Sequence, residues 1–180
     1  MAYSLSLPHV CPLENKGLGS YEKPYLCEDI EVTLWISILM DDKQLVLDQR
    51  YLRMARIWAE NSYCERRKVG VLIVKDKRII SDGYNGTPVG FENICEDDEG
   101  FTKPYVLHAE ANAISKVASS TNDCSGATVY VTDAPCIECA KLIIQSHISR
   151  VVYASEYRLR EGVELLERAG IQVDFLPIED

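Results

Sequence analysis

Two short segments of the chain contain the residue types that bind a metal ion and move protons. Residues 108–110 read His-Ala-Glu, and residues 135–139 read Pro-Cys-Ile-Glu-Cys. Together they offer three ligands, His108, Cys136 and Cys139. Three protein ligands suit a tetrahedral zinc ion whose fourth position is open to water, which is typical of catalytic rather than structural zinc. The sequence therefore predicts a site for one catalytic Zn²⁺ ion.

The spacing of the two cysteines places both sulfur atoms on one side of a helix start. Helical positions i and i+3 are neighbours, and Pro135 directly before Cys136 suits the first turn of a helix. The positive end of the helix dipole also helps cysteines there to ionise. A lone Cys-x-x-Cys can be a redox motif, but a redox dithiol would not need His108 and Glu110 at a second helix start.

Glu110 follows His108 by two positions. Their side chains converge only in a first helical turn whose end faces the metal. Zinc with two thiolate ligands acidifies water less than zinc with three histidines, so a nearby proton acceptor matters more. We therefore predict that Glu110 is the catalytic residue that moves protons. A structural zinc site would more often have a fourth Cys or His at motif spacing.

Regular apolar patterns predict the elements that must position these two segments. A helix is expected from Asp41 to about Asn61, and its buried face should hold Leu45, Leu52, Ala55 and Trp58. Further helices are expected at about 108–119, 136–146 and 160–169. Short β-branched or apolar runs predict strands at 69–74, 78–84, 127–132, 151–154 and 171–175.

The order of these elements predicts the fold class. Residues 75–77, Lys-Asp-Lys, form a turn that joins the first two strands into an antiparallel hairpin. From residue 127 onward strands and helices alternate, and such crossovers place neighbouring strands parallel. We predict an α/β protein, a three-layer α/β/α sandwich with a mixed five-stranded sheet whose last three strands are parallel. Residues 85–105 are expected to form a long loop, and long loops in compact domains are often functional.

The chain of 180 residues is long enough for one domain with an apolar core. Residues 40–180 are predicted to form that domain. Residues 1–39 contain chain breakers without a helical or strand period, and we predict an irregular or disordered extension there. A related hypothesis is that Met40 is the usual start of the protein. Residues 1–39 would then be present only when translation starts upstream of Met40. A docked additional strand or helix is the alternative.

The composition of the chain limits its expected cellular location and its expected binding partners. The formal net charge of −9 counts against nucleic acid as a partner, because phosphate binding depends largely on Lys and Arg. The sequence has neither an apolar run of membrane-spanning length nor a secretory leader, so we expect a cytoplasmic protein. In that setting the seven cysteines favour metal binding or plain burial over a disulfide framework.

Residues from about 49 to 175 resemble the deoxycytidylate (dCMP) deaminases of the cytidine deaminase superfamily. The likeness extends beyond the zinc ligands to four blocks in the family's order: 68–70, 83–88, 108–114 and 135–145. The resemblance implies zinc-dependent hydrolysis of dCMP to dUMP and ammonia, which supplies the precursor of dTMP. It also implies a homo-oligomer, a hexamer or a dimer.

The resemblance further implies substrate contacts. Asn85 would contact the sugar or base, backbone groups of Ala109 and Pro135 would contact the pyrimidine, and Tyr157 is a further candidate. Three consecutive basic residues form the candidate site for the 5′-phosphate. They are Arg66, Arg67 and Lys68.

Two departures from the family pattern limit what can be carried over. Many relatives hold a second, structural zinc, and Cys64 and Cys95 match two of its ligands, but residues 100–107 contain neither Cys nor His. We therefore expect two buried thiols rather than a second zinc. Phe91 stands where many relatives have a glycine, in a region linked to activation by dCTP and inhibition by dTTP. That regulation is not carried over to this chain.

Other functions stay open at this point. A neighbouring deaminase of the same superfamily, acting on tRNA adenosine, cytosine or guanine, would use the same zinc chemistry. The acidic composition counts against tRNA, and the Gly-Tyr-Asn-Gly block at residues 83–86 counts against both tRNA adenosine and free cytosine. The other class is a non-catalytic zinc-binding protein. Glu110 disfavours it, because a purely structural metal does not need that carboxylate.

Overall fold

The structure, a computed structural model, describes residues 28–157 and 159–178, with side chains from Lys43 onward. Residues Leu39–Asp180 form one compact unit. Most of the predicted N-terminal extension, residues 1–27, lies outside the described residues, so its character stays a prediction. No helix in the described part of the chain is long and apolar enough to cross a membrane.

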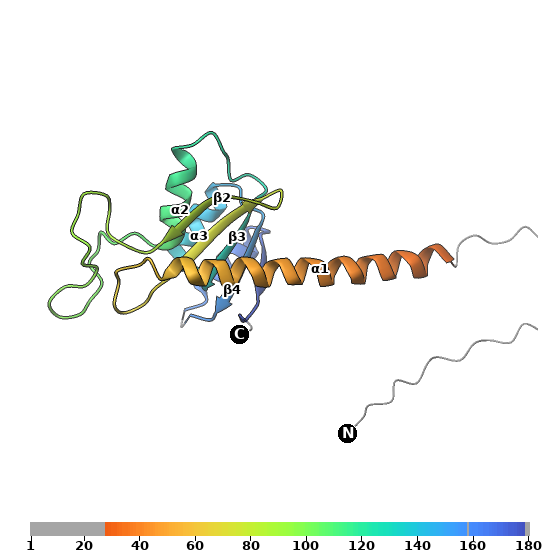
Figure 1. The fold of residues 1–180 in the computed structure, drawn as a ribbon, viewed down its shortest axis with the longest axis horizontal. Coiled ribbons are helices and arrows are strands. Elements are labelled where there is room, and N and C mark those ends of the chain that lie inside the picture. Colours follow the sequence, from red (N-terminus) through yellow and green to blue (C-terminus); the bar gives the residue numbers. More distant parts are fainter. Residues whose placement is uncertain (1–27, 158, 179–180) are drawn as a thin grey trace, which may run out of the picture. The chain divides into compact units, whose positions relative to one another are not determined.

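Five strands form one mixed sheet, as predicted (Figure 1). They are β1 (Gly70–Lys75), β2 (Arg78–Tyr84), β3 (Thr128–Asp133), β4 (Arg150–Ser155) and β5 (Gln172–Phe175). Their order in the sheet is β2-β1-β3-β4-β5. Strand β1 pairs antiparallel with both β2 and β3, whereas β3, β4 and β5 are parallel to one another. The predicted parallel arrangement of the last three strands is confirmed.

The described residues contain four helices: α1 (Glu28–Ala59), α2 (Ala109–Ala118), α3 (Ile137–Gln145) and α4 (Glu161–Arg168). The last three match the predicted helices closely. Helix α1 begins at Glu28 rather than at Asp41, so the irregular structure expected up to residue 39 is wrong for residues 28–39. Residues 28–41 contain neither glycine nor proline, and nothing in the sequence therefore breaks a helix before Asp41.

The sheet separates two apolar cores, which confirms the three-layer sandwich. Alternate strand residues point to opposite faces. Val71, Val129 and Val151 face the core that contains residues of α2, α3 and α4. Tyr130 and Val152 face the second core, which is shared with α1. Helices α2 and α3, which hold the predicted zinc ligands, therefore lie in one layer.

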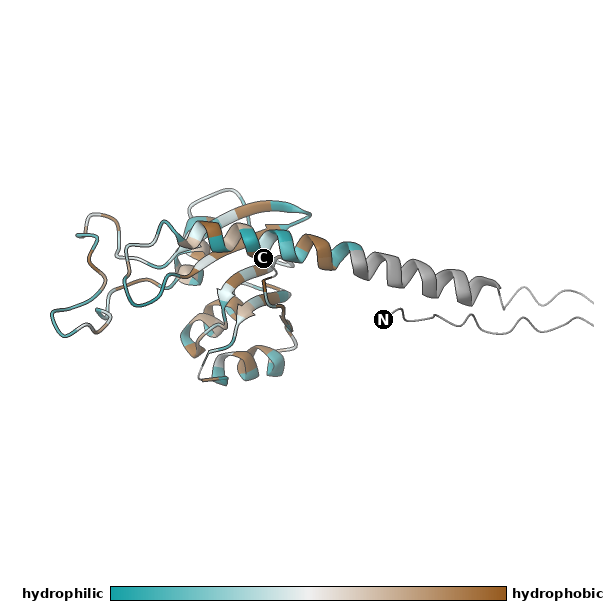
Figure 2. Cartoon of the chain, turned by 60° about the horizontal axis from the view of Figure 1, so that its bottom comes forward, coloured by the Kyte–Doolittle hydropathy of each residue, from teal (hydrophilic) through white to brown (hydrophobic). Residues whose placement is uncertain are grey.

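The buried face of α1 differs from the predicted one. Leu52 and Ala55 are buried as expected, but Leu45 is 48% exposed and Trp58 is 38% exposed. The Trp58 indole N–H instead donates to Asp82 Oδ1 at 2.8 Å. Asp48, a charged residue, is 2% exposed and lies on the buried face. Figure 2 shows polar and apolar residues alternating along the coloured part of α1.

Burial of Asp48 is possible because it bonds to other polar side chains in what we call the acid–arginine cluster, made of Asp48, Tyr130, Arg150 and Asp174. The Arg150 guanidinium donates to both carboxylate oxygens of Asp48, at 2.7 and 3.1 Å, and to Asp174 at 2.7 Å. The Tyr130 hydroxyl donates to Asp48 Oδ1 at 2.6 Å. Burial alone would raise the pKa of Asp48, but these hydrogen bonds and one from Gln44 hold it below its ordinary value.

Candidate metal centre and active site

The two chemical segments lie at the starts of α2 and α3. His108 is the residue that precedes α2, and Cys136 precedes α3, each with an extended backbone conformation. Cys139 is the third residue of α3, in its first turn. The His108 Nδ1 atom is 3.3 Å from the Cys136 sulfur and 3.4 Å from the Cys139 sulfur. The three residues that sequence spacing predicted as ligands are thus brought together.

The donor atoms of this trio fit a zinc ion. All three atoms lie within 4.8 Å of one another. Ordinary tetrahedral Zn–S and Zn–N bond lengths separate a sulfur and a nitrogen ligand by about 3.5 Å, close to the distances found. One imidazole and two thiols is also a donor set that zinc prefers.

The charges within the trio are coupled. The pKa of Cys136 is lowered to about 3, first because the Cys139 thiol donates to it and also because His108 does, against the opposing effect of burial. The pKa of Cys139 is raised by that same hydrogen bond and by burial. The pKa of His108 is raised, chiefly by its hydrogen bond with Cys136. Negative charge therefore gathers on the Cys136 sulfur, while Cys139 keeps its proton as the donor of that hydrogen bond. A thiolate is the form of cysteine that binds a metal cation.

Glu110 is a buried carboxyl group beside this trio. It is 5% exposed and lies in the first turn of α2. Burial raises its pKa, although the nearby charge of His108 and a hydrogen bond with Cys139 act in the opposite direction. A carboxyl group whose pKa is raised towards neutrality can both accept and release a proton.

A cavity of about 480 Å³ opens at the trio. Of the predicted substrate contacts, Asn85, Ala109 and Tyr157 line it, as do Arg66 and Arg67. Two further predicted contacts are absent from its wall over the described residues, and their role stays a prediction. They are Lys68, which is exposed, and Pro135, which is buried with its carbonyl oxygen beside Gly162. Ala134, one residue earlier, does line the cavity.

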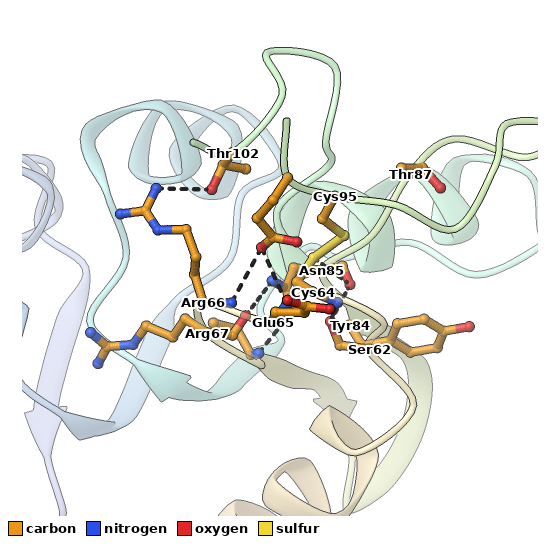
Figure 3. The surroundings of a disulfide bond; sticks show 12 residues. Ser62, Cys64, Glu65, Arg66, Arg67, Tyr84, Asn85, Thr87, Cys95 and Thr102 are labelled. Atoms are coloured by element: carbon orange, nitrogen blue, oxygen red, sulfur yellow. Dashed lines mark hydrogen bonds between the residues drawn. A yellow bond between two sulfur atoms is a disulfide. The ribbon is translucent and has the colours of Figure 1, made fainter. Parts of the chain in front are cut away.

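The two arginines of the cavity wall differ in how far their charge is already neutralised. Arg67 donates two hydrogen bonds to the carboxylate of Asp133, at 2.6 and 2.7 Å, and lies over the Tyr157 ring at 5.5 Å. Arg66 donates one hydrogen bond to the Thr102 hydroxyl at 3.3 Å (Figure 3). Arg66 thus retains more of its capacity to bind an anion.

Asn85 has a structural task that its sequence context did not reveal. Its side-chain oxygen accepts a hydrogen bond from Val69 N, and its side-chain nitrogen donates to the Arg67 carbonyl oxygen, both at 2.8 Å. These contacts fix the segment that bears the two arginines (Figure 3). Each group of the amide can make a further hydrogen bond, so a substrate contact is compatible with this role.

Cys64 and Cys95 form a disulfide bond, so the expectation of two buried thiols is wrong for this pair. Both residues are buried, and their Cα atoms are 5.1 Å apart, within the range that a disulfide spans. The bond joins the segment before β1 to the long loop, which runs away from the sheet in Figure 1. Glu96 strengthens the connection by accepting backbone hydrogen bonds from Glu65 and Arg66.

Sequence reasoning missed three polar residues of the cavity wall, Asp133, Glu96 and Thr102. A usable signal existed for Asp133, which ends β3 directly before the cysteine segment. Carboxyl ends of parallel strands commonly border ligand sites in open α/β sheets. Glu96 and Thr102 lie in the irregular long loop, where no periodic pattern places them.

Known proteins match this chain over most of its described length. Residues 45–155 match the family described as "cytidine and deoxycytidylate deaminase zinc-binding region". A deoxycytidylate deaminase of Mycobacterium phage D29 is 39% identical over 123 residues, which cover 61% of this chain and 94% of the phage protein. The "ComE operon protein 2" of Bacillus subtilis is 37% identical over 139 residues, covering 74% of this chain and 72% of that protein.

A solved structure agrees in fold. The crystal structure of dCMP deaminase from the cyanophage S-TIM5, in complex with dCMP and dUMP, superposes with a TM-score of 0.69 at 40% sequence identity. The match covers 71% of this chain and 94% of the cyanophage protein. The same protein in its apo form gives a TM-score of 0.65.

Proposed function

We propose that this chain, which belongs to the cytidine and deoxycytidylate deaminase zinc-binding family, hydrolyses dCMP to dUMP and ammonia. The observation that carries the proposal is the convergence of His108, Cys136 and Cys139 on one point beside buried Glu110, at the floor of a cavity. Several relatives named deoxycytidylate deaminase support the choice of substrate.

The catalytic roles follow from the chemistry of amine hydrolysis at a cytosine ring. Zinc held by the three ligands would acidify a water molecule for attack on C4 of the base. Glu110 then accepts one proton from the attacking water and delivers it to ring N3. It later accepts the second proton, from the hydroxyl added at C4, and delivers it to the amine, which leaves as ammonia when the C4–N bond breaks. Burial of Glu110 keeps competing water away from its carboxyl group.

The cavity wall suggests how the nucleotide is oriented. Ala109 directly follows the predicted ligand His108 and can offer its backbone to the pyrimidine, while Asn85 and Tyr157 also line the cavity. Ala134 takes the place that the sequence predicted for Pro135, because it is the residue that lines the cavity. On this arrangement of the cavity wall, the proposal is that the ring of the base binds at the trio and the phosphate binds at the arginine segment.

Arg66 is the proposed main contact to the 5′-phosphate, because Asp133 already neutralises Arg67. Arg66→Ala is expected to raise the Michaelis constant for dCMP about tenfold, as for loss of a charged hydrogen bond, and to leave that for deoxycytidine nearly unchanged. Arg67→Ala should affect both substrates alike, because it also releases Asp133 and Tyr157. Steady-state kinetics with both substrates checks this. Equal losses for both substrates in Arg66→Ala would contradict the phosphate role.

An ammonia-release assay on the zinc-loaded protein tests the proposed reaction. The substrates are dCMP, deoxycytidine, cytosine, guanine and adenosine-bearing RNA, each with the Glu110→Gln variant as a background control. Turnover of dCMP well above the others is the expected result. Preference for another base would replace the proposal with a different deaminase, and absence of any turnover would indicate a zinc-binding protein without catalysis.

Three further expectations belong to the same proposal. They are a homo-oligomeric state, hexamer or dimer, a cytoplasmic location, and a place in dTMP synthesis. The first and third are carried over from the resemblance to the dCMP deaminases. Size-exclusion chromatography with light scattering measures the first directly.

A further inference from the structure

Two glycines lie behind the two helix starts that provide the zinc ligands. Gly83, in β2, faces the first turns of α2, which begins directly after His108. Gly162, in the first turn of α4, faces the segment from which α3 begins. Both contacts are made to backbone atoms, which cannot swing aside as the end of a flexible side chain can.

The space at both glycines is too small for a methyl group. A Cβ at Gly83 would lie 2.9 Å from Ala113 N and closer still to the Ala109 carbonyl oxygen. A Cβ at Gly162 would lie 2.7 Å from the Cys136 carbonyl carbon and 2.9 Å from its oxygen, and closer still to Pro135 O. Real Cβ contacts are essentially never under 3.0 Å. Any side chain would therefore push α2 or the Cys136 segment away.

Zinc binding makes such a displacement costly. Zn–S and Zn–N distances are held within about 0.2 Å of their ideal values, and the ligands come from two separate helices. His108 Nδ1 already lies within 3.4 Å of both sulfur atoms. The distance between the starts of α2 and α3 therefore determines how well the three ligand atoms fit a zinc ion.

Two side-chain hydrogen bonds hold α2 at the same place. The Ser81 hydroxyl of β2 donates to the Ala113 carbonyl oxygen at 2.8 Å, and Asn112 Nδ2 donates to the Tyr84 carbonyl oxygen at 3.0 Å. Ser81 and Tyr84 are close to Gly83 in the sequence of β2. Strand β2 therefore holds α2 through these two hydrogen bonds and through the close backbone contact at Gly83.

We propose that Gly83 and Gly162 are positioning residues that set the separation of the α2 and α3 starts and thereby the zinc affinity of the site. The proposal rests on the zinc site and not on the identity of the substrate. Its test therefore measures zinc binding, so that it can fail or succeed independently of dCMP turnover.

Gly70 offers a matched control on the other face of the sheet. A Cβ there would lie 2.6 Å from Ala59 N and closer still to Ala55 O, both in α1. The steric conflict is of the same kind, but it displaces a helix that holds no zinc ligand. Gly70→Ala should lower the free energy of unfolding and leave zinc affinity unchanged.

The experiment compares Gly83→Ala, Gly162→Ala and Gly70→Ala with the wild-type protein. Zinc dissociation constants are measured by competition with a chromogenic chelator, and the visible spectrum of the Co²⁺-substituted protein reports ligand geometry. We expect the zinc affinity of the first two variants to fall about 10- to 100-fold, as for loss of outer support at other metal sites, with an altered Co²⁺ spectrum.

Ser81→Ala keeps the proposal testable if a glycine variant does not fold. This change removes one attachment of α2 without adding an atom, so it cannot overpack the site. A smaller loss of zinc affinity in the same direction is expected. Wild-type zinc affinity in Ser81→Ala and in every folded glycine variant would overturn the proposal, and so would an equal loss of affinity in Gly70→Ala.

Discussion

Two polar groups lie on opposite faces of the same sheet and differ in how far their bonding capacity is used. In the acid–arginine cluster, the Arg150 guanidinium is shared between Asp48 and Asp174, and Tyr130 completes the bonding of Asp48. At the metal centre, two sulfur atoms share a single imidazole nitrogen beside the buried carboxyl group of Glu110.

The difference separates a structural group from a chemical one. In the acid–arginine cluster the one cation, Arg150, is already paired with the two carboxylates of Asp48 and Asp174, so its charge is used within the fold. At the metal centre, three donor atoms converge without a permanent cation from the protein, and a cavity gives access to them. Loss of a residue from the first group should therefore change stability, whereas loss from the second should change zinc content and turnover.

The largest effect is expected at the metal centre. Cys139→Ser should reduce bound zinc from about one ion per chain to near zero, because only two of the three strong ligands remain. Turnover of dCMP should be abolished with it. Zinc content is measured by atomic emission after dialysis, with Cys124→Ser, a free cysteine outside the trio, as control. Full zinc content in Cys139→Ser would remove this residue from the ligand set.

A smaller effect, on stability alone, is expected in the acid–arginine cluster. Arg150→Met leaves the carboxylate of Asp48 buried without its cation, which should lower the free energy of unfolding by about 3 kcal/mol. Zinc content and kcat should stay at wild-type values. Lys75→Met is the control, because the Lys75–Asp123 pair is largely exposed and worth at most about 1 kcal/mol.

Urea unfolding at neutral pH compares these two variants. Equal losses of stability would show that the burial of Asp48 does not distinguish the cluster from a surface ion pair. A large loss of zinc in Arg150→Met would show that the two faces of the sheet are coupled.

The smallest expected effect is the pH dependence of the stability that Asp48 contributes. Because the pKa of Asp48 is lower in the folded chain than its ordinary value of 3.8, its ionised form stabilises the fold above that value. This contribution is lost as the pH falls through the lowered pKa. The stability difference between wild type and Asp48→Asn should therefore be full at pH 5 to 7 and shrink below about pH 4. A difference that does not change with pH would contradict the role of the ionised carboxylate.

The same contrast explains what the sequence could predict. The zinc ligands and Glu110 were found because their residue types stand at short, fixed spacings. The five strands and helices α2, α3 and α4 followed from regular apolar patterns. Local patterns of this kind need no knowledge of distant contacts.

Interactions between distant residues were not predictable in this way. In the sequence, Asp48 looks like an exposed polar residue of α1. Its burial depends on its partner Arg150, which lies 102 residues later in the chain. The Arg67–Asp133 pair spans 66 residues, and it changes which arginine is free for phosphate. The Cys64–Cys95 bond joins a short segment to a loop without periodicity, so spacing alone left two thiols as the simpler expectation.

Glu110→Gln gives the most direct test of the claim that three residues hold zinc while a fourth moves protons. The amide keeps the size of the side chain but cannot accept a proton from water. Zinc content and kcat for dCMP are measured on the same sample. We predict full zinc content with kcat lower by about 10²- to 10⁴-fold. Unchanged turnover, or loss of zinc together with activity, would contradict the assigned division of roles.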